Sequence, residues 1–171
     1  MQFTKYIFIT NTPIYMKRLK TLILFAFFIT AAQMCSAQSY IYKGKNANTN
    51  DIIFTFDNEH VYRGRYANYN SIILTWDGKH AYKGKNTNYN DIILTWDGEH
   101  IYNGKYENYN NIVYTWDGEH LYKGKYTNFN DIIMTFDGEH IYKSRYSNYN
   151  DIIYTVSGRV PIALLALLLY L

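Results

Sequence analysis

Short runs of β-branched and aromatic residues alternate with polar turn residues through most of the chain. In one stretch, the run Ile92-Ile93-Leu94-Thr95-Trp96 is followed by Asp97-Gly98 and then by Ile101-Tyr102. Two such runs around Asp-Gly predict a β-hairpin, because both central residues of a type I′ turn need a positive φ angle. We therefore expect a two-residue turn that places Leu94 opposite Ile101.

This hairpin unit repeats every 20 residues without an insertion. A tyrosine opens a Tyr-x-Gly or Tyr-x-Ser tripeptide in each copy, at Tyr42, Tyr62, Tyr82, Tyr102, Tyr122 and Tyr142. A threonine recurs in the other strand, at Thr55, Thr75, Thr95, Thr115, Thr135 and Thr155. Six copies predict one all-β domain of about twelve antiparallel strands over residues 38–159. The Asn-rich segments between hairpins, such as residues 88–91, predict ordered turns.

The two ends of the array each hold half a unit. The array opens with the strand Tyr40-Ile41-Tyr42-Lys43 and finishes with the strand Ile152-Ile153-Tyr154-Thr155. An open array would leave both strands as exposed edges, which proteins generally avoid. If the array curls round, the two halves pair and complete a sixth hairpin. We therefore expect a closed, barrel-like ring.

The C-terminal segment, residues 160–171, is apolar throughout. Pro161 stands where a first helical turn tolerates proline, and Ser157-Gly158 before it can turn the chain. A ring of about twelve strands is too wide for its inward side chains alone to fill, since about eight strands is the limit. We expect a hydrophobic helix that plugs the ring. Membrane contact by this tail stays open as an alternative, although a helix of that length spans about 18 Å against roughly 30 Å of hydrocarbon.

Residues 1–37 predict an upstream extension followed by a signal peptide. A positive stretch begins at Met16, a largely apolar run covers residues 22–32, and Cys35-Ser36-Ala37 has the small-x-small form of a cleavage site. We expect translation to start at Met16, cleavage after Ala37, and export to the periplasm, the cell surface or the medium. The only cysteine, Cys35, would be lost with the signal.

Charge and composition narrow the range of partners. Aromatic residues make up 19% of the chain and include 20 tyrosines, which suits half-buried strands. Without residues 1–37 the chain keeps 13 Lys+Arg against 14 Asp+Glu, and near neutrality argues against a nucleic-acid partner. The Lys-Gly-Lys pairs at 43–45, 83–85 and 123–125 are balanced by carboxylates elsewhere in their units.

The repeated Asp-Gly-x-x-x-Tyr-x-Gly pattern, the strand count and the hydrophobic tail together resemble the β-flower group of bacterial repeat barrels. That group is itself similar in shape to the Tubby C-terminal domain. The resemblance covers residues 40–171 and implies a ring of β-hairpins. Tubby domains bind phosphoinositides through basic residues, but this sequence has no matching cluster, and no such site is carried over.

Two polar residue types recur once per unit and need an interpretation. Five histidines could form a metal-binding ring: His60, His80, His100, His120 and His140. We expect instead that each histidine is a strand residue paired across its own hairpin with a threonine, because a wide ring would keep the five apart. Five aspartates stand at the hairpin tips, where turn chemistry explains them better than acid/base catalysis: Asp57, Asp77, Asp97, Asp117 and Asp137. The sequence predicts no catalytic, cofactor-binding or metal-ligating residue.

Trp76, Trp96 and Trp116 are the candidate ligand-stacking residues, and core packing is the competing interpretation. Taken together, the sequence predicts a non-enzymatic, exported structural or binding module. Membrane lipid and glycan stay open as its partner. Two alternatives are a carbohydrate- or cell-wall-binding aromatic repeat protein and an open scaffold like the MORN repeats, which share the Tyr-x-Gly and Asp-Gly framing.

Overall fold

The computed structural model describes residues 38–168, and the expected signal peptide, its cleavage site and Cys35 lie outside this range. The described chain contains twelve strands: β1 (Ser39–Lys43), β2 (Ile52–Phe56), β3 (His60–Arg63), β4 (Ile72–Trp76), β5 (His80–Lys83), β6 (Ile92–Trp96), β7 (His100–Asn103), β8 (Ile112–Trp116), β9 (His120–Lys123), β10 (Ile132–Phe136), β11 (His140–Tyr142) and β12 (Ile152–Ser157). One helix, α2 (Ile162–Leu168), follows them. The predicted all-β architecture is confirmed.

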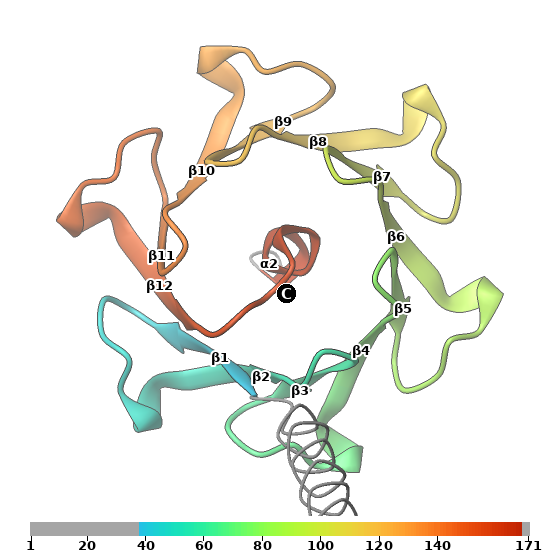
Figure 1. The fold of residues 1–171 in the computed structure, drawn as a ribbon, viewed down its shortest axis with the longest axis vertical. Helices are drawn as coiled ribbons and strands as arrows, with labels where there is room; N and C mark the ends of the chain where they lie inside the picture. Colours follow the sequence, from blue (N-terminus) through green and yellow to red (C-terminus); the bar gives the residue numbers. More distant parts are fainter. Residues whose placement is uncertain (1–37, 169–171) are drawn as a thin grey trace, which may run out of the picture. The chain divides into compact units, whose positions relative to one another are not determined.

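The strands form a closed antiparallel ring in which each strand pairs with its neighbours in the sequence (Figure 1). Strand β1 closes the ring because it pairs with β2 on one side and with β12 on the other. Tyr40 lies opposite Thr55 of β2 and opposite Ser157 of β12. The closure expected from the two half units is confirmed, and the open MORN-like scaffold is wrong.

The Asp-Gly turns are longer than the sequence pattern suggested. In the hairpin of β6 and β7, Trp96 lies opposite Ile101 and Leu94 lies opposite Asn103, so residues 97–100 form the connection. The Asp97 carboxylate accepts hydrogen bonds from the backbone N–H groups of residues 99 and 100, at 2.8 and 2.6 Å. This side-chain capture of two N–H groups favours the longer turn. The predicted two-residue turn, with Leu94 opposite Ile101, is wrong.

The longer turn also changes the partner of each histidine. Thr95 pairs with Tyr102 in its own hairpin, whereas His100 lies opposite Thr115 of the next hairpin. The expected pairing of each histidine with a threonine of its own hairpin is therefore wrong. The histidines face threonines across the boundary between units, where they help to join one hairpin to the next.

Six outer loops, which we call petals, project from the ring between successive hairpins and cover residues 44–51, 64–71, 84–91, 104–111, 124–131 and 144–151 (Figure 1). Each petal ends in one turn of 3-10 helix: η1 (Thr49–Asp51), η2 (Tyr69–Ser71), η3 (Tyr89–Asp91), η4 (Tyr109–Asn111), η5 (Phe129–Asp131) and η6 (Tyr149–Asp151). The fully buried Thr95 hydroxyl donates to the Gly104 carbonyl oxygen at 2.7 Å and so anchors the start of a petal. The predicted ordered turns correspond to these petals.

Where a petal leads into the next strand, a β-bulge shifts the register of the ring. Between β7 and β8, Ile101 lies opposite Tyr114 while Tyr102 lies opposite Ile112, so Val113 is the extra residue. A bulge bends a strand and re-aims its side chains. As a result, the consecutive residues Val113 and Tyr114 both pack against the hydrophobic cluster inside the ring.

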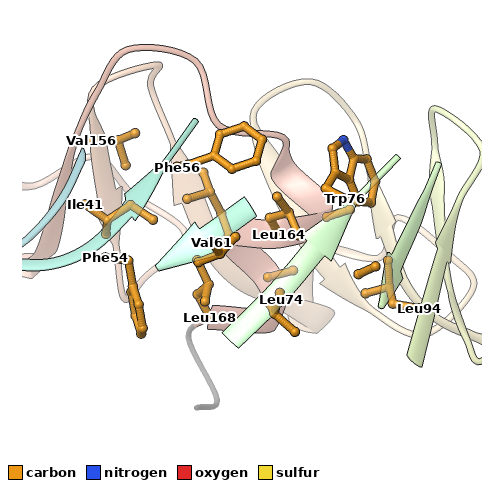
Figure 2. Packing of buried hydrophobic residues seen from close by; sticks show 14 of the residues in the cluster. Ile41, Phe54, Phe56, Val61, Leu74, Trp76, Leu94, Val156, Leu164 and Leu168 are labelled. Carbon is orange, nitrogen blue, oxygen red and sulfur yellow. The ribbon is translucent and has the colours of Figure 1, made fainter. Parts of the chain in front are cut away.

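The interior of the ring is filled by strand side chains and by α2, which lies at its centre (Figures 1 and 2). Figure 2 shows Leu164 of the helix among Val61, Leu74 and Trp76 of the strands. Leu164 and Leu165 are 0% and 1% exposed. Full burial of one leucine side chain stabilises a fold by about 1.5–3 kcal/mol. The expected central plug is confirmed for Ile162–Leu168, and no helix within the described residues is long and apolar enough to cross a membrane.

Candidate binding surfaces

The three tryptophans proposed for ligand stacking lie inside the ring, one per unit, at the end that carries the Asp-Gly turns. Trp76 is 6% exposed, and Trp96 and Trp116 are half-buried against the same hydrophobic cluster. They contribute to the core that surrounds α2. Beside them, a cavity of about 450 Å³ opens between the turns and residues 158–161, which connect β12 to α2. The cavity is lined by Phe56, Asn58, Trp76, Phe136, Gly138, Gly158, Arg159, Val160 and Pro161.

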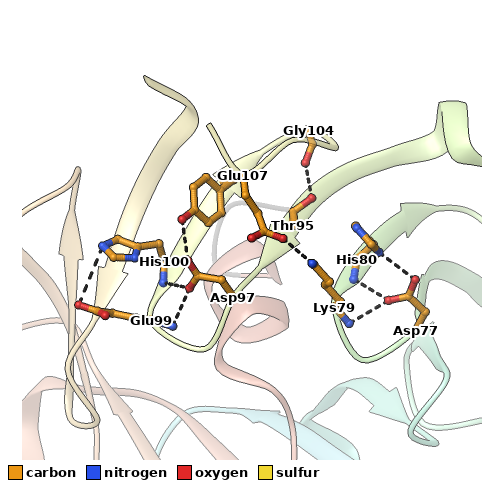
Figure 3. A network of polar contacts seen from close by, with 10 residues as sticks. Asp77, Lys79, His80, Thr95, Asp97, Glu99, His100, Gly104 and Glu107 are labelled. Atoms are coloured by element: carbon orange, nitrogen blue, oxygen red, sulfur yellow. Dashed lines mark hydrogen bonds and ion pairs between the residues drawn. The ribbon is translucent and has the colours of Figure 1, made fainter. Parts of the chain in front are cut away.

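The aspartates and histidines of the turns form small polar clusters on the outside of the ring (Figure 3). In one cluster the Asp77 carboxylate accepts hydrogen bonds from the His80 backbone N–H and from the Tyr82 hydroxyl, both at 2.6 Å. The His80 Nδ1 atom lies 3.0 Å from the same carboxylate. A Tyr hydroxyl is bonded in the same way in all five units that have an aspartate.

These hydrogen bonds shift the pKa values of both partners away from neutral pH. Partial burial raises the pKa of Asp117, but hydrogen bonds from the His120 N–H, the Tyr122 hydroxyl and the Glu119 N–H outweigh it and bring the pKa to about 2. The hydrogen bond to Asp117, together with burial, raises the pKa of Tyr122 to about 12. A carboxylate that is ionised and a tyrosine that is protonated throughout the range around neutral pH suit a structural role. Within residues 38–168, no group of three His, Cys, Asp or Glu side chains is arranged to hold a metal ion.

Within residues 38–168, the strongly exposed aromatic side chains all belong to the petals. Nine of these described residues are more than half exposed: Tyr66, Tyr69, Tyr89, Tyr106, Tyr109, Tyr126, Phe129, Tyr146 and Tyr149. Burying an aromatic ring is strongly favourable in water, so a set of exposed rings gathered on one class of loop indicates a contact surface. The sequence pattern pointed to the three tryptophans, and these petal residues were not predicted as a site. These aromatic residues lie in the connections between strands, and that position was the sequence signal that could have identified them as exposed.

A cation covers most of these rings. Lys85 Nζ lies 3.9 Å from the centre of the Tyr69 ring and donates to the Asn70 side-chain oxygen at 3.5 Å. The same arrangement joins a petal to the next at three further places, where the ammonium lies 3.9–4.2 Å from the ring: Lys105 with Tyr89, Lys125 with Tyr109, and Lys45 with Tyr149. We call each such combination of ring, cation and asparagine a notch. Arg145 covers Phe129 at 4.4 Å, and Arg65 covers Tyr66 of its own petal at 5.4 Å.

Comparison with known protein families agrees with this geometry. The 6-fold beta flower protein family matches residues 32–115 and 104–163, which together cover most of the chain. The chain belongs to this family. No curated protein and no solved structure matches it. The predicted family is thus confirmed, and the six petals of the structure correspond to the six-fold symmetry in the family's description.

The symmetry of this beta flower is broken at the petals. The Tyr109 hydroxyl lies 2.7 Å from the Tyr126 hydroxyl of the next petal, and Tyr89 makes the same contact with Tyr106 at 3.0 Å. At the positions equivalent to Tyr126, the chain has Asn86 opposite Tyr69 and Asn46 opposite Tyr149. Tyr69 and Tyr149 are accordingly 68% and 65% exposed, against 57% for Tyr109. Two notches of the beta flower therefore have no second ring.

Proposed function

We propose that this beta flower is an exported, non-enzymatic binding module whose petals bind a repetitive carbohydrate polymer such as a cell-wall glycan. The observation that carries the proposal is the confinement of the exposed aromatic rings to the petals, next to amide and hydroxyl groups. A pyranose ring has an apolar face that stacks on an aromatic ring, and hydroxyl groups that bond to polar neighbours. Tyrosine offers both an apolar body and a polar tip.

Repetition of the petals supports a polymeric partner over a single small molecule. Each notch alone presents a small, solvent-exposed surface, so its affinity for one sugar should be weak. When several sites on one rigid ring engage repeating units of one chain, later contacts are intramolecular and the overall affinity rises by about 10²–10⁴. A closed ring of petals is a rigid support for such a set of sites.

The assignment of a non-enzymatic role rests on how the turn clusters use their polar groups. The Asp97 carboxylate accepts three hydrogen bonds, from two backbone N–H groups and from the Tyr102 hydroxyl. Most of its hydrogen-bonding capacity is used within the turn, which is why we assign it a structural role. Export is supported by the succession of positive, apolar and small residues between 16 and 37.

Burial of the tail is the reason for preferring a glycan to a membrane as the partner. Leu164 and Leu165 would have to leave the ring before they could insert into lipid, which would remove the centre of the core. A membrane contact through the tail therefore carries a large cost in folding free energy. The petals, in contrast, are accessible in the folded ring.

Co-sedimentation of the purified protein with insoluble peptidoglycan, chitin and cellulose tests the proposal. We expect binding to at least one polymer, and we expect the double variant Tyr69→Ala/Tyr149→Ala to weaken it at least about tenfold because both open notches lose their stacking surface. Tyr102→Phe, which alters a buried tyrosine of the ring, is the control and should bind as the unmodified protein does. The proposal fails if the folded protein sediments with none of the polymers, or if it sediments only with lipid vesicles.

A further inference from the structure

One position of the repeat carries a cation in every petal: Lys45, Arg65, Lys85, Lys105, Lys125 and Arg145. The four lysines among them are the notch cations. None of these six side chains forms an ion pair within residues 38–168. In this part of the chain, the lysine that forms an ion pair with a carboxylate is Lys79, whose partner is Glu107. A second row of exposed cations precedes them by two residues: Lys43, Arg63, Lys83, Lys123 and Lys143. The petals together with the strand ends beside them thus carry a belt of cations that pair with no carboxylate.

Positive and negative charge are unevenly distributed within each unit, although the near-neutral balance of the whole domain conceals this. The turns at one end carry nine carboxylates, on Asp57, Glu59, Asp77, Asp97, Glu99, Asp117, Glu119, Asp137 and Glu139. The petals and the strand ends that lead into them carry eleven Lys or Arg residues and five carboxylates. The two groups of charges are not isolated from each other, because Glu107 of a petal pairs with Lys79 of a turn. Apart from this pair, a ligand at the petals meets more cations than carboxylates.

The notch cations are also held in place before any ligand arrives. Lys105 Nζ lies 4.1 Å from the centre of the Tyr89 ring and donates to the Asn90 side-chain oxygen at 3.3 Å. An ammonium group has three donors, so two remain after the bond to asparagine. Fixing a lysine side chain in advance reduces the entropy lost on binding. An ordered, unpaired ammonium beside an exposed ring is suited to an anionic group carried on a sugar.

We propose that the polymer bound by the petals is an acidic polysaccharide, whose carboxylate or phosphate groups meet the notch cations while its sugar rings stack on the adjacent tyrosines. The inference rests on the proposed function and specifies the class of its ligand. The open notches at Tyr69 and Tyr149 supply both contacts, with Lys85 and Lys45 as the anion-binding groups. Neighbouring notches are two strands apart, at least about 10 Å, so one extended chain can engage several of them.

The experiment compares the binding of the purified protein to four soluble polymers: polygalacturonate, a phosphate-bearing teichoic acid, neutral dextran and single-stranded DNA. We expect polygalacturonate or teichoic acid to bind at least about tenfold more tightly than dextran, and the affinity to fall at least about tenfold between 50 and 300 mM NaCl, because salt screens exposed charges. The triple variant Lys45→Gln/Lys85→Gln/Lys125→Gln should lose at least about tenfold in affinity for the acidic polymer while its dextran binding stays unchanged.

Two control variants separate the notches from general charge attraction. Arg159→Gln removes an exposed cation outside the petals and should leave affinity unchanged. Lys43→Gln/Lys83→Gln/Lys123→Gln removes as much charge from the strand ends beside the petals as the first triple variant removes from the notches, and should have a clearly smaller effect.

Equal losses of affinity in the two triple variants would overturn the assignment to the notches. Wild-type affinity in the notch variant, or a preference for DNA over both acidic polysaccharides, would also overturn it. Binding to dextran, chitin or cellulose without binding to acidic polymers would overturn this inference and leave the proposed function standing, whereas binding to no polysaccharide would defeat both.

Discussion

The hydroxyl of Thr155 donates a hydrogen bond of 2.9 Å to the carbonyl oxygen of Gly44, which lies 111 residues earlier in the chain. In the middle of the array, the Thr95 hydroxyl makes the same bond to the Gly104 carbonyl oxygen, nine residues later, at 2.7 Å. The contact that anchors a petal within the array is therefore repeated where the two ends of the array meet. Closure of the ring uses the same side-chain chemistry as each of its internal steps.

This equivalence predicts the effect of removing either hydroxyl. Thr155→Val and Thr95→Val should each lower the free energy of unfolding by about 1–2 kcal/mol, because each leaves a carbonyl without its partner. Denaturant unfolding of both variants provides the measurement. In an open array the Thr155 substitution would have little effect while Thr95→Val kept its full cost, and that asymmetry would contradict the closed ring.

The second prediction concerns the helix that fills the ring. Leu164→Ala and Leu165→Ala should each cost about 2–5 kcal/mol, since both side chains are buried and leave a cavity. Leu167→Ala, on a half-buried side chain of the same helix, is the matched control and should cost clearly less. Thermal melting with a hydrophobic dye would detect the loosened core. Equal melting temperatures for the variants and the unmodified protein would show that the helix does not stabilise the ring.

Much of this fold could be predicted because the repeat removes the usual ambiguity. A single hairpin pattern is weak evidence, but six copies in register fix the strand count, and the half units Tyr40–Lys43 and Ile152–Thr155 imply closure. The width of the ring then required a plug, and an apolar segment was available at residues 160–171. These steps depend on the number of repeats and on the two unpaired strands at the ends of the array, both of which can be seen directly in the sequence.

The register of the turns could not be predicted in the same way. Asp97-Gly98 suits a two-residue turn, and the longer turn depends on the Asp97 side chain capturing the N–H groups of residues 99 and 100. The sequence does not show which of these two uses of aspartate prevails. The notches were also hidden, because Lys85 and Tyr69 are 16 residues apart and meet only when adjacent petals lie side by side.

The third prediction tests the turn geometry. Gly98 has a φ angle of 106°, which side chains rarely adopt, and the equivalent residue of the first turn is Asn58 at 80°. Gly98→Ala should therefore destabilise the protein by about 1 kcal/mol. Gly98→Asn should cost less, because asparagine tolerates positive φ better than alanine does. Denaturant midpoints of the two variants decide the matter, and an alanine variant as stable as the asparagine variant would argue against this conformation.

The fourth prediction concerns export. If residues 16–37 are a signal peptide, the exported protein should begin at or near Gln38. Mass spectrometry of the secreted or periplasmic fraction gives the N-terminus directly. A variant with Arg in place of Ala37 alters the small residue before the cleavage site and should accumulate uncleaved. Protein with an intact Met1 in the cytoplasm would contradict export.

The last prediction follows from the Asp–Tyr hydrogen bonds of the turns. The pKa of Asp117 is lowered to about 2 from an ordinary value of 3.8, so its contribution to stability is present above about pH 4 and is lost as the pH falls toward 2. The pKa of Tyr122 is raised to about 12 from 10.0, so its contribution is complete below pH 10 and is lost as the pH rises toward 12. The free energy of unfolding, measured by denaturant titration from pH 2 to 12, should therefore be flat with respect to these groups between about pH 5 and 9 and should fall at both ends.

The variant Tyr82→Phe/Tyr102→Phe/Tyr122→Phe tests this assignment. It should be less stable at pH 7, by about 1–2 kcal/mol for each lost hydrogen bond, and should lose less stability than the unmodified protein between pH 10 and 12. Tyr66→Phe, on a petal, is the control and should keep the full alkaline loss. If the triple variant falls as steeply as the unmodified protein above pH 10, the turn tyrosines are not the groups whose ionisation unfolds the ring.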